Sequence, residues 1–389
     1  MAKYCDCESS LSLSRRSLLK AGAILTFAAL PELSLARDVS ETRLLVILLR
    51  GGMDGLYAMP PVGDSQLAGL RRHINPQEFH ELDGFFALHP VFGTIKGMYD
   101  QGQALLVHAA SLPYTGRSHF EGQDIMETGV MRPYASQSGW LGRALDAQGF
   151  QSIAMTLPIP LILRGKATRD SAYPSWLSSM PSSVYSALAG LWAADPELSA
   201  VGNQLIEQRD LLAQKPDHYI GDVNTIQSLA RDAGARLKKG EGPRIAVLDH
   251  VGFDSHANEP SDATHRMKEV DEAIGEFRKA IGDDVWKHTL IVTVTEFGRT
   301  VAENGSFGTD HGWGTSIFVM GGKLKKSGIV ADWPGLKNSA LFEGRDLKAT
   351  IDARTLYGSI VSSALEIDPN RVKRDIFEYS PTGKFDAYL

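Results

Sequence analysis

Short apolar segments rich in branched side chains alternate along this chain with longer amphipathic stretches, and this alternation constrains the fold most strongly. Several short segments are apolar throughout, which is typical of parallel strands covered by helices on both faces. The expected strands span 43–49, 103–110, 152–156, 244–250, 289–295 and 315–321. The expected helices span 91–101, 119–128, 138–148, about 195–213, 222–238, 263–281 and 351–365. The pattern predicts an α/β fold with a mostly parallel central sheet.

The first 36 residues predict an export signal outside the fold. The stretch "SRRSLLK" (14–20) precedes the apolar run "AGAILTFAAL" and the small-residue site Ser34-Leu35-Ala36, which is the order of a twin-arginine signal. The run of ten residues is short for a bilayer span. We expect cleavage near Ala36, a periplasmic location, no integral membrane segment afterwards, and contact with the twin-arginine translocase during export. This route carries folded proteins, which allows an exported protein partner or a preloaded metal.

Composition excludes several function classes. Both cysteines, Cys5 and Cys7, lie in the signal, so any nucleophile of the mature chain must be oxygen or nitrogen. Removing residues 1–36 moves the formal charge from −6 to −7, which disfavours nucleic acid binding. Residues 37–389 are long enough to bury one substantial core, and we expect a single domain. The proline-containing stretch 157–221 is interpreted as an insertion that covers or shapes a pocket.

Ionisable residues follow four of the expected strands. In open α/β sheets, ligands bind beyond the carboxyl ends of the strands. The residues concerned are Asp54 after the first strand, Ser118 after the second, Asp249, His250, Asp254 and His256 after 244–250, and Glu296, Arg299, Asp310 and His311 after 289–295. Carboxylates and imidazoles that converge from separate segments provide the oxygen and nitrogen ligands of a divalent metal.

Each of these residues also has a structural interpretation. Ser118 and Glu121 form an S-x-x-E capping box, and that interpretation is favoured when the pair is taken alone. Asp54 after paired glycines fits a turn. The same holds for the remaining polar pairs, which fit a hydrogen-bonded loop (Asp254 and His256), a turn (Asp310 and His311) and a local ion pair (Glu296 and Arg299). Their joint placement at strand ends favours a functional site.

The motifs together resemble a known family. They are "RGGMDGL", "PYTGRSHFEGQDIMETG", "GFDSHANE" and "TEFGRT" with "NGSFGTDHGWG", behind a twin-arginine signal. In this combination the chain resembles the exported family catalogued as domain of unknown function 1501, which is similar to the alkaline phosphatase and sulfatase superfamily. The resemblance covers essentially the whole mature chain. It implies an alkaline-phosphatase-like three-layer sandwich, with helices on both faces of the sheet.

The resemblance also implies roles for individual residues in metal-assisted transfer of a phosphate or sulfate ester. Ser118 matches the nucleophile at a helix start, and Arg117 or Arg299 would hold the charged oxygens. The implied ligands of one or two ions of Zn, Mn, Mg or Ca are Asp54, Asp254, His256, Glu296, Asp310 and His311. The substrate would be a small-molecule or envelope ester.

Three departures from the superfamily pattern weigh against two-metal phosphatase chemistry or sulfatase chemistry. Glu296-Phe297 stands where active members have Asp-His, which removes an imidazole. The usual Asp-x-x-x-His is compressed to Asp254-x-His256, unless Asp249 or His250 contributes. Ser111 echoes the start of the sulfatase signature, but Tyr114 and Thr115 replace its next Ser-Arg. The sequence therefore predicts a periplasmic metal-dependent ester hydrolase or transferase. The alternative is an inactive superfamily member that binds or assembles an envelope component.

Overall fold

The computed structural model describes residues 42–173, 199, 225–377 and 383–389. The predicted signal and, apart from residue 199, the predicted helix at about 195–213 and the insertion beyond residue 173 lie outside the described residues. Residues Glu41–Leu389 form one compact unit. No helix in the described part of the chain combines the length and the hydropathy needed to cross a membrane.

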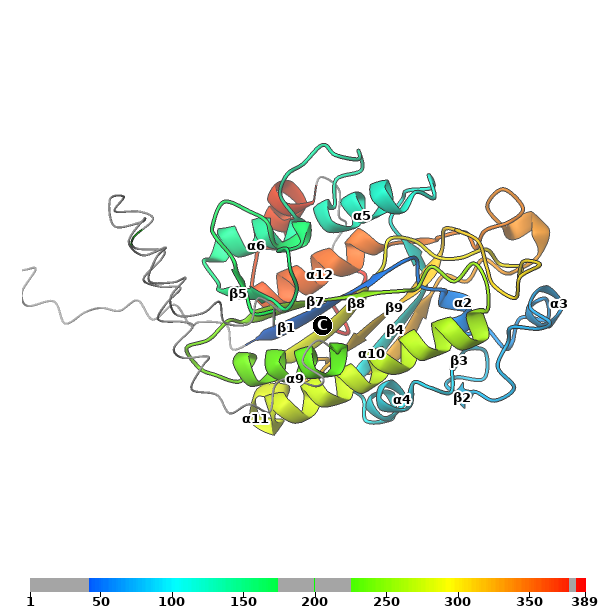
Figure 1. The fold of residues 1–389 in the computed structure, drawn as a ribbon, viewed down its shortest axis with the longest axis horizontal. Helices are drawn as coiled ribbons and strands as arrows, with labels where there is room; N and C mark the ends of the chain where they lie inside the picture. Colours follow the sequence, from blue (N-terminus) through cyan, green and yellow to red (C-terminus); the bar gives the residue numbers. More distant parts are fainter. Residues whose placement is uncertain (1–41, 174–198, 200–224, 378–382) are drawn as a thin grey trace, which may run out of the picture. The chain divides into compact units, whose positions relative to one another are not determined.

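A sheet of nine strands runs through this unit (Figure 1), in the order β10-β4-β9-β8-β1-β7-β5-β6, with β11 also paired to β4. The strands are β1 (Arg43–Arg50), β4 (Ala104–Ser111), β5 (Ser152–Ala154), β6 (Asp170–Ser171), β7 (Ile245–Val251), β8 (Thr289–Val294), β9 (Thr315–Met320), β10 (Gly328–Ala331) and β11 (Ile351–Asp352). The six predicted strands are confirmed, each within two residues of its predicted bounds. A separate antiparallel pair joins β2 (His80–Glu81) to β3 (Ala87–Leu88).

Helices lie between most of the strands. They are α2 (Gly55–Ala58), α3 (Leu67–Leu70), α4 (Gly93–Asp100), α5 (His119–Thr128), α6 (Trp140–Gln148), α9 (Ile226–Leu237), α10 (Glu259–Ile281), α11 (Asp283–Trp286), α12 (Ala353–Leu365) and α13 (Pro369–Arg371). Short 3-10 turns span Leu161–Leu163 and Asn338–Ala340, and a π-helical turn spans Val372–Ile376. The predicted helices within the described residues are confirmed, and α10 begins four residues before its predicted start.

Alternate side chains of the apolar central strand β1 enter two separate cores. One core lies against α6 and α12, and the other lies against α9 and α10. Figure 1 shows α5, α6 and α12 on one side of the sheet and α4, α9 and α10 on the other. The residues that divide in this way are Leu44, Val46 and Leu48 on the first face and Leu45, Ile47 and Leu49 on the second. The predicted three-layer arrangement is therefore confirmed.

Strand β9 is the antiparallel member of the sheet, and its direction shapes the loop that precedes it. It runs against both β8 and β4, whereas β1 runs parallel to β7 and β8. Neighbouring antiparallel strands need no crossover helix. The loop 295–314 therefore leaves the carboxyl end of β8 and returns into β9 at the same edge of the sheet, where its side chains stay beside those that follow β1 and β7.

Glycines let the backbone of this loop pass in contact with other backbone. A Cβ added at Gly298 would lie 2.0 Å from the carbonyl oxygen of Gly314, and one at Gly308 would lie 2.4 Å from the carbonyl carbon of His256. A Cβ at Gly312 would lie 2.4 Å from the backbone of Arg299. The two arms are joined by the bonds Gly298 N–H to Trp313 O and Thr300 N–H to Asp310 O, both 2.9 Å. Close packing of the two arms, rather than loop flexibility, therefore explains these glycines.

We predict that Gly312→Ala destabilises the protein by about 1–3 kcal/mol, because the new methyl group overlaps backbone that cannot rotate away. Gly305→Ala is the matched control, since an added Cβ there meets nothing within 4 Å. The free energy of unfolding, measured in urea, should stay within about 0.5 kcal/mol of the parent for the control. Equal stabilities of the two variants would contradict the close-packing explanation.

Candidate metal centre

Imidazole and carboxylate groups converge beyond the carboxyl ends of β7 and β8. His119, Asp254 and His311 offer ligand atoms that all lie within 4.8 Å of one another. Asp254 Oδ1 lies 3.3 Å from His119 Nε2 and 3.1 Å from His311 Nε2. His256 Nε2 lies 3.1 Å from the same oxygen and 3.0 Å from His311 Nε2. We call these four residues the imidazole cluster.

The outer ring nitrogen of each histidine is held by an oxygen. His119 Nδ1 lies 2.9 Å from Glu296 Oε1, and His256 Nδ1 lies 3.1 Å from Asp310 Oδ1. His311 Nδ1 lies 2.8 Å from the carbonyl oxygen of Arg117. Since a ring N–H at Nδ1 donates to each of these oxygens, the lone pair of the neutral ring is at Nε2. Metal-binding histidines are usually oriented by this kind of outer hydrogen bond.

The four residues come from three elements that meet at this edge of the sheet. His119 is the first residue of α5, which follows β4, and Asp254 and His256 lie in the loop between β7 and α10. His311 lies on the returning arm of the loop 295–314, where it pairs with Arg299 on the outgoing arm. The side chain of Asp254 is 44% exposed, so the cluster is open to a ligand from solvent.

A buried guanidinium fixes the loops that carry the cluster. Arg299 donates to the carbonyl oxygens of Gly51, Gly52 (2.8 Å), Phe253 (2.9 Å) and Thr309 (3.2 Å). Its Nη2 also lies 2.6 Å from Asp254 Oδ1. The side chain is fully buried. Arg299 therefore holds Asp254 in place, with its donors facing the protein.

Charge and burial set opposite pKa shifts within the cluster. The hydrogen bond to Glu296 raises the pKa of His119, whereas burial lowers the pKa of His311. Burial opposes ionisation of Asp254, but the hydrogen bond and charge of Arg299 outweigh it and lower the pKa to about 2. Burial likewise opposes ionisation of Glu296, and hydrogen bonds from His119 and Gln123 outweigh it, so its pKa is lowered. Both carboxylates are therefore charged at neutral pH.

Three protein ligand atoms, from His119, Asp254 and His311, lie close enough together to hold one metal ion and leave a position for a further ligand, and His256 lies beside this group. Bonds of about 2.0–2.1 Å in a tetrahedral site place ligand atoms roughly 3.3 Å apart, and the atoms around Asp254 Oδ1 lie 3.1–3.3 Å from it. His119 Nε2 is buried and makes no hydrogen bond to the described residues. It lies 3.3 Å from Asp254 Oδ1, and a neutral ring with its proton on Nδ1 presents a lone pair to that carboxylate, which is costly unless a cation lies between them. Two imidazoles and one carboxylate, with the third imidazole of His256 beside them, suit zinc or a similar first-row ion.

Asp54 lies outside the cluster, although the sequence places it among the ligands. Its Oδ1 caps α2 by accepting from the backbone N–H of Leu56 (2.8 Å) and Tyr57 (3.0 Å). Its Oδ2 lies 2.7 Å from Nη1 of the buried Arg71. Burial, and then the negative charge of Asp54, raise the pKa of the neighbouring Glu259 well above its ordinary value. In this structure Asp54 belongs to a buried ionic network that holds α2 and α10.

The structure also places the other predicted site residues. Ser118 is the N-cap of α5, but its side chain accepts no capping hydrogen bond, so the capping-box interpretation is wrong. The guanidinium of Arg117 contacts Asp346 (2.7 Å) and Glu343 (2.6 Å). Asp249 pairs with Arg50 and His250 pairs with Glu269, so neither reaches the cluster. Ser111 ends β4 and is buried. Glu296 and Asp310 orient histidines and contribute no ligand atom of the group around Asp254.

His119 is the functional residue that the sequence reasoning missed. It directly follows Ser118 in the motif "GRSHFEG" and opens the helix after β4. The criterion that selected the other residues, an imidazole just beyond a strand, applies equally to this position. The S-x-x-E pattern at the same place indicates a helix cap at Ser118 and Glu121 and gives no role to His119.

Comparison with protein families identifies the chain. A family model described as "Protein of unknown function (DUF1501)" matches residues 102–367. The match covers more than half of the chain and includes the whole imidazole cluster, while Asp54 lies before it. The chain belongs to the DUF1501 family. No curated protein matches its sequence.

Several solved structures are similar to this DUF1501 chain. The C-terminal periplasmic domain of EcEptC from Escherichia coli, in complex with Zn, is 12% identical over 73% of this chain and 74% of that chain, with a TM-score of 0.36. A protein in the alkaline phosphatase superfamily from Vibrio parahaemolyticus is 12% identical over 83% and 67%, with a TM-score of 0.41. A phosphonate monoester hydrolase of Agrobacterium radiobacter is 12% identical over 72% and 68%, with a TM-score of 0.36.

Phe297 occupies the space beside the imidazole cluster of this DUF1501 protein. Its ring lies 4.9 Å from that of His119 and 5.1 Å from that of His311, measured between centroids. It is fully buried and lies against Gly52 and Gly122. A phenyl group offers no ligand atom. The described residues around this ring therefore offer ligand atoms for one ion, and the phenyl ring fills the space beside them.

We predict that Glu296→Gln weakens zinc binding by about 10–100-fold, because loss of the carboxylate leaves His119 less basic and less well oriented. Zinc affinity would be measured by competition with a chromophoric chelator. Glu269→Gln is the matched control, since its carboxylate pairs with a histidine outside the cluster. Unchanged zinc affinity in Glu296→Gln would contradict the assignment of the cluster as a metal site.

Proposed function

We propose that this DUF1501 protein is a metal-dependent hydrolase or transferase of phosphate or sulfate esters, with Ser118 as its nucleophile. One observation carries the proposal: three imidazoles present Nε2 to the same carboxylate oxygen while an oxygen holds each Nδ1. Histidines that bind metals are usually held in this way by a hydrogen bond at the ring nitrogen that does not bind the ion.

The residues that would hold the ion are His119, Asp254 and His311, and His256 lies beside them, 3.0 Å from His311 Nε2. A bound ion would polarise the ester and lower the pKa of a nearby hydroxyl. We propose zinc or a similar ion and a single site, because calcium and magnesium favour all-oxygen sites and Phe297 fills the adjacent space. The affinity of the site depends on Glu296, Asp310 and the carbonyl of Arg117, since these hold the three rings.

In this proposal Ser118 acts as the nucleophile. It stands between Arg117, whose carbonyl holds His311, and the cluster residue His119. Its hydroxyl is not used for capping, and it lies at the N-terminus of a ten-residue helix, where the dipole favours an anion. In the proposed step the Ser118 oxygen bonds to phosphorus or sulfur while the ester bond to the alcohol breaks. The serine proton leaves with the alcohol, and water then releases phosphate or sulfate from the serine.

Arg117 and Arg299 act in this proposal through the residues they hold. Arg299 fixes the Asp254 carboxylate, and Arg117 fixes the His311 ring through its carbonyl oxygen. The guanidinium of Arg117 is partly exposed and stands beside Ser118 in sequence, so it is the better placed of the two to reach an ester oxygen. That contact would require Arg117 to exchange part of its pairing with Glu343, which is exposed.

A non-catalytic binding protein is the second candidate, and one contact favours it. The charged Asp254 is already neutralised by Arg299 at 2.6 Å, so its carboxylate has a cation in the absence of metal. Combined with Phe297 in place of an imidazole, this arrangement would suit a protein that keeps the fold and binds an envelope component. The two candidates differ in whether Ser118 affects turnover.

We predict that Ser118→Ala lowers ester turnover by at least ~1000-fold and leaves metal content and stability unchanged. Metal content would be measured by elemental mass spectrometry, and the same samples assayed on aryl phosphate monoesters, diesters and an aryl sulfate. Thr115→Ala, an exposed position in the same loop, is the control and should retain activity. Folded, metal-loaded parent protein without turnover would favour the binding protein. Turnover that survives in Ser118→Ala would exclude this nucleophile.

We further propose export by the twin-arginine route and action on an envelope ester in the periplasm. Replacing Arg15 and Arg16 by lysine should block export, because the translocase reads the arginine pair. Cell fractionation would then find the uncleaved chain in the cytoplasm, whereas the exported parent should begin just after Ala36. An exported, processed double-lysine variant would contradict this route.

A further inference from the structure

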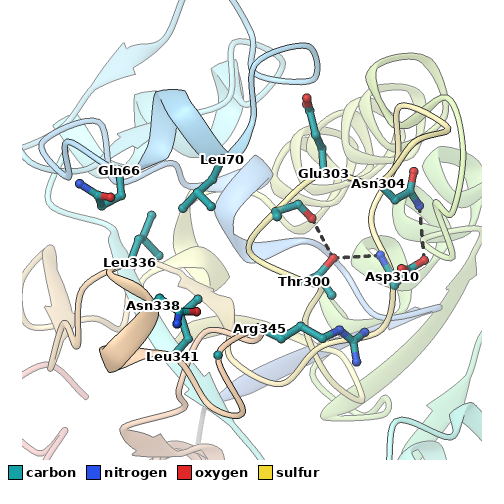
Figure 2. A pocket seen from close by; sticks show the side chains of 12 residues that line it. Gln66, Leu70, Thr300, Glu303, Asn304, Asp310, Leu336, Asn338, Leu341 and Arg345 are labelled. Carbon is teal, nitrogen blue, oxygen red and sulfur yellow. Dashed lines mark hydrogen bonds between the residues drawn. The ribbon is translucent and has the colours of Figure 1, made fainter.

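A cavity of about 400 Å³ lies beside the imidazole cluster. Figure 2 shows its walls, which come from three parts of the chain: the helix α3, the loop 300–310 and the segment 336–345. Pockets for small molecules commonly have about 300–1,000 Å³. The volume therefore suits a ligand with a single ring or a short polyol.

Two side chains of the cavity wall also touch histidines of the cluster. Asp310 Oδ1 lies 3.1 Å from His256 Nδ1, and Arg345 Nη2 donates to the carbonyl oxygen of His311 at 2.6 Å. Both residues line the cavity. The cavity therefore borders the cluster through the contacts of Asp310 with His256 and of Arg345 with His311.

The two sides of the cavity differ in chemistry. Leu70, Leu336 and Leu341 line one side and belong to, or pack on, an apolar cluster with Val301. In Figure 2 the labelled polar residues Thr300, Asn304 and Asp310 lie on the opposite side, with Arg345 below them, and the amides of Gln66 and Asn338 lie among the leucines. A ligand that fits this cavity has an apolar face and polar groups around its edge.

Unused hydrogen-bonding groups of the cavity include donors and acceptors. Within the described part of the chain, no hydrogen bond is made by the side-chain amide of Asn338, by Asp310 Oδ2 or by Arg345 Nη1. Thr300 and Asn304 are already engaged with the backbone and with Asp310. The free groups are thus a carboxylate acceptor, a guanidinium donor and an amide that can do both.

We propose that this cavity binds the alcohol part of the ester, and that this alcohol is a neutral polyhydroxylated group the size of one sugar ring. This inference rests on the proposed ester chemistry. Each hydroxyl both donates and accepts, so hydroxyls on adjacent carbons can pair with Asp310, Arg345 and Asn338. The carbon-bound face of the ring packs on the leucines.

Other classes of alcohol fit less well. An alkyl or aryl group of the same size would displace water from Asp310 and Arg345 without replacing its hydrogen bonds, and sites built for hydroxyls reject such analogues strongly. A second anionic group is disfavoured because the lining carries two carboxylates, Glu303 and Asp310, against the single guanidinium of Arg345. A neutral alcohol with several hydroxyl groups is therefore the class that fits the cavity best.

Binding is tested on the metal-loaded full chain with two probes that share a six-membered ring and differ in their hydroxyl groups. Methyl glucoside and cyclohexylmethanol would be compared by saturation-transfer NMR and calorimetry. We expect the glucoside to bind and cyclohexylmethanol not to bind. Leu341→Trp, which fills the cavity, and Asn338→Leu, at an exposed position, should each weaken the glucoside at least ~10-fold. Lys268→Trp on the outer face of α10 is the control and should bind as the parent does.

Turnover is tested with glucose 6-phosphate and cyclohexylmethyl phosphate, or the matching sulfates. We expect kcat/KM for the sugar ester to exceed kcat/KM for the cyclohexylmethyl ester by at least ~10-fold. This preference should be lost in Asn338→Leu. Binding of the glucoside without turnover of any ester would keep the cavity assignment and overturn the ester chemistry. Turnover with equal ratios, insensitive to Leu341→Trp, would keep the chemistry and overturn the cavity assignment. Preference for the cyclohexyl probe, or binding of neither probe, would overturn the proposed ligand class.

Discussion

The site depends on the hydrogen bonds that the guanidinium of Arg299 donates to the surrounding loops. The guanidinium is fully buried, and its donors reach the loops after β1 and β7 and the returning arm of the loop 295–314. Breaking a buried charged network by removing one partner typically costs 3–5 kcal/mol, because the remaining charge is left unpaired. Asp254 therefore cannot move independently of these loops. The imidazole cluster has a rigid protein charge behind it and solvent in front.

Most of the regular fold could be predicted from the sequence, because strand and helix periodicity determine it locally. The run in β1 alternates between two cores, and this explains why both of its faces are apolar. The short strand β11 was predicted as the first turn of a helix, since two residues carry no detectable period. Asp352 ends that strand and caps α12 by accepting from Arg354 N–H. The antiparallel direction of β9 could not be predicted either, because an apolar run of residues looks the same in a parallel and in an antiparallel strand.

The sequence predicts which loops meet at the site, but it does not predict where each side chain of those loops points. The sequence placed Asp254, His256 and His311 at strand ends, and the structure brings them together. Asp54 satisfied the same criterion, yet the free N–H groups at the start of α2 bind its carboxylate instead. His119 lies in the cluster because it opens α5, and the sequence does predict that this helix starts at residue 119. Spacing in sequence indicates which residues arrive at an edge, whereas local hydrogen bonds decide where each side chain points.

The paired arms of the loop 295–314 have a consequence for how the family can diverge. Backbone bonds near its base fix Glu296 and His311, whereas Glu303 and Asn304 near its tip line the cavity. Gly305 lies at this tip, with nothing within 4 Å of the position of a Cβ. Changes at Gly305 would therefore reshape the cavity while His119 and His311 stay in place, whereas changes at Asn304 also reach His256, whose carbonyl oxygen accepts from the Asn304 amide. Variation at the tip of this loop can thus change which ligand the cavity accepts without removing the candidate metal ligand His311.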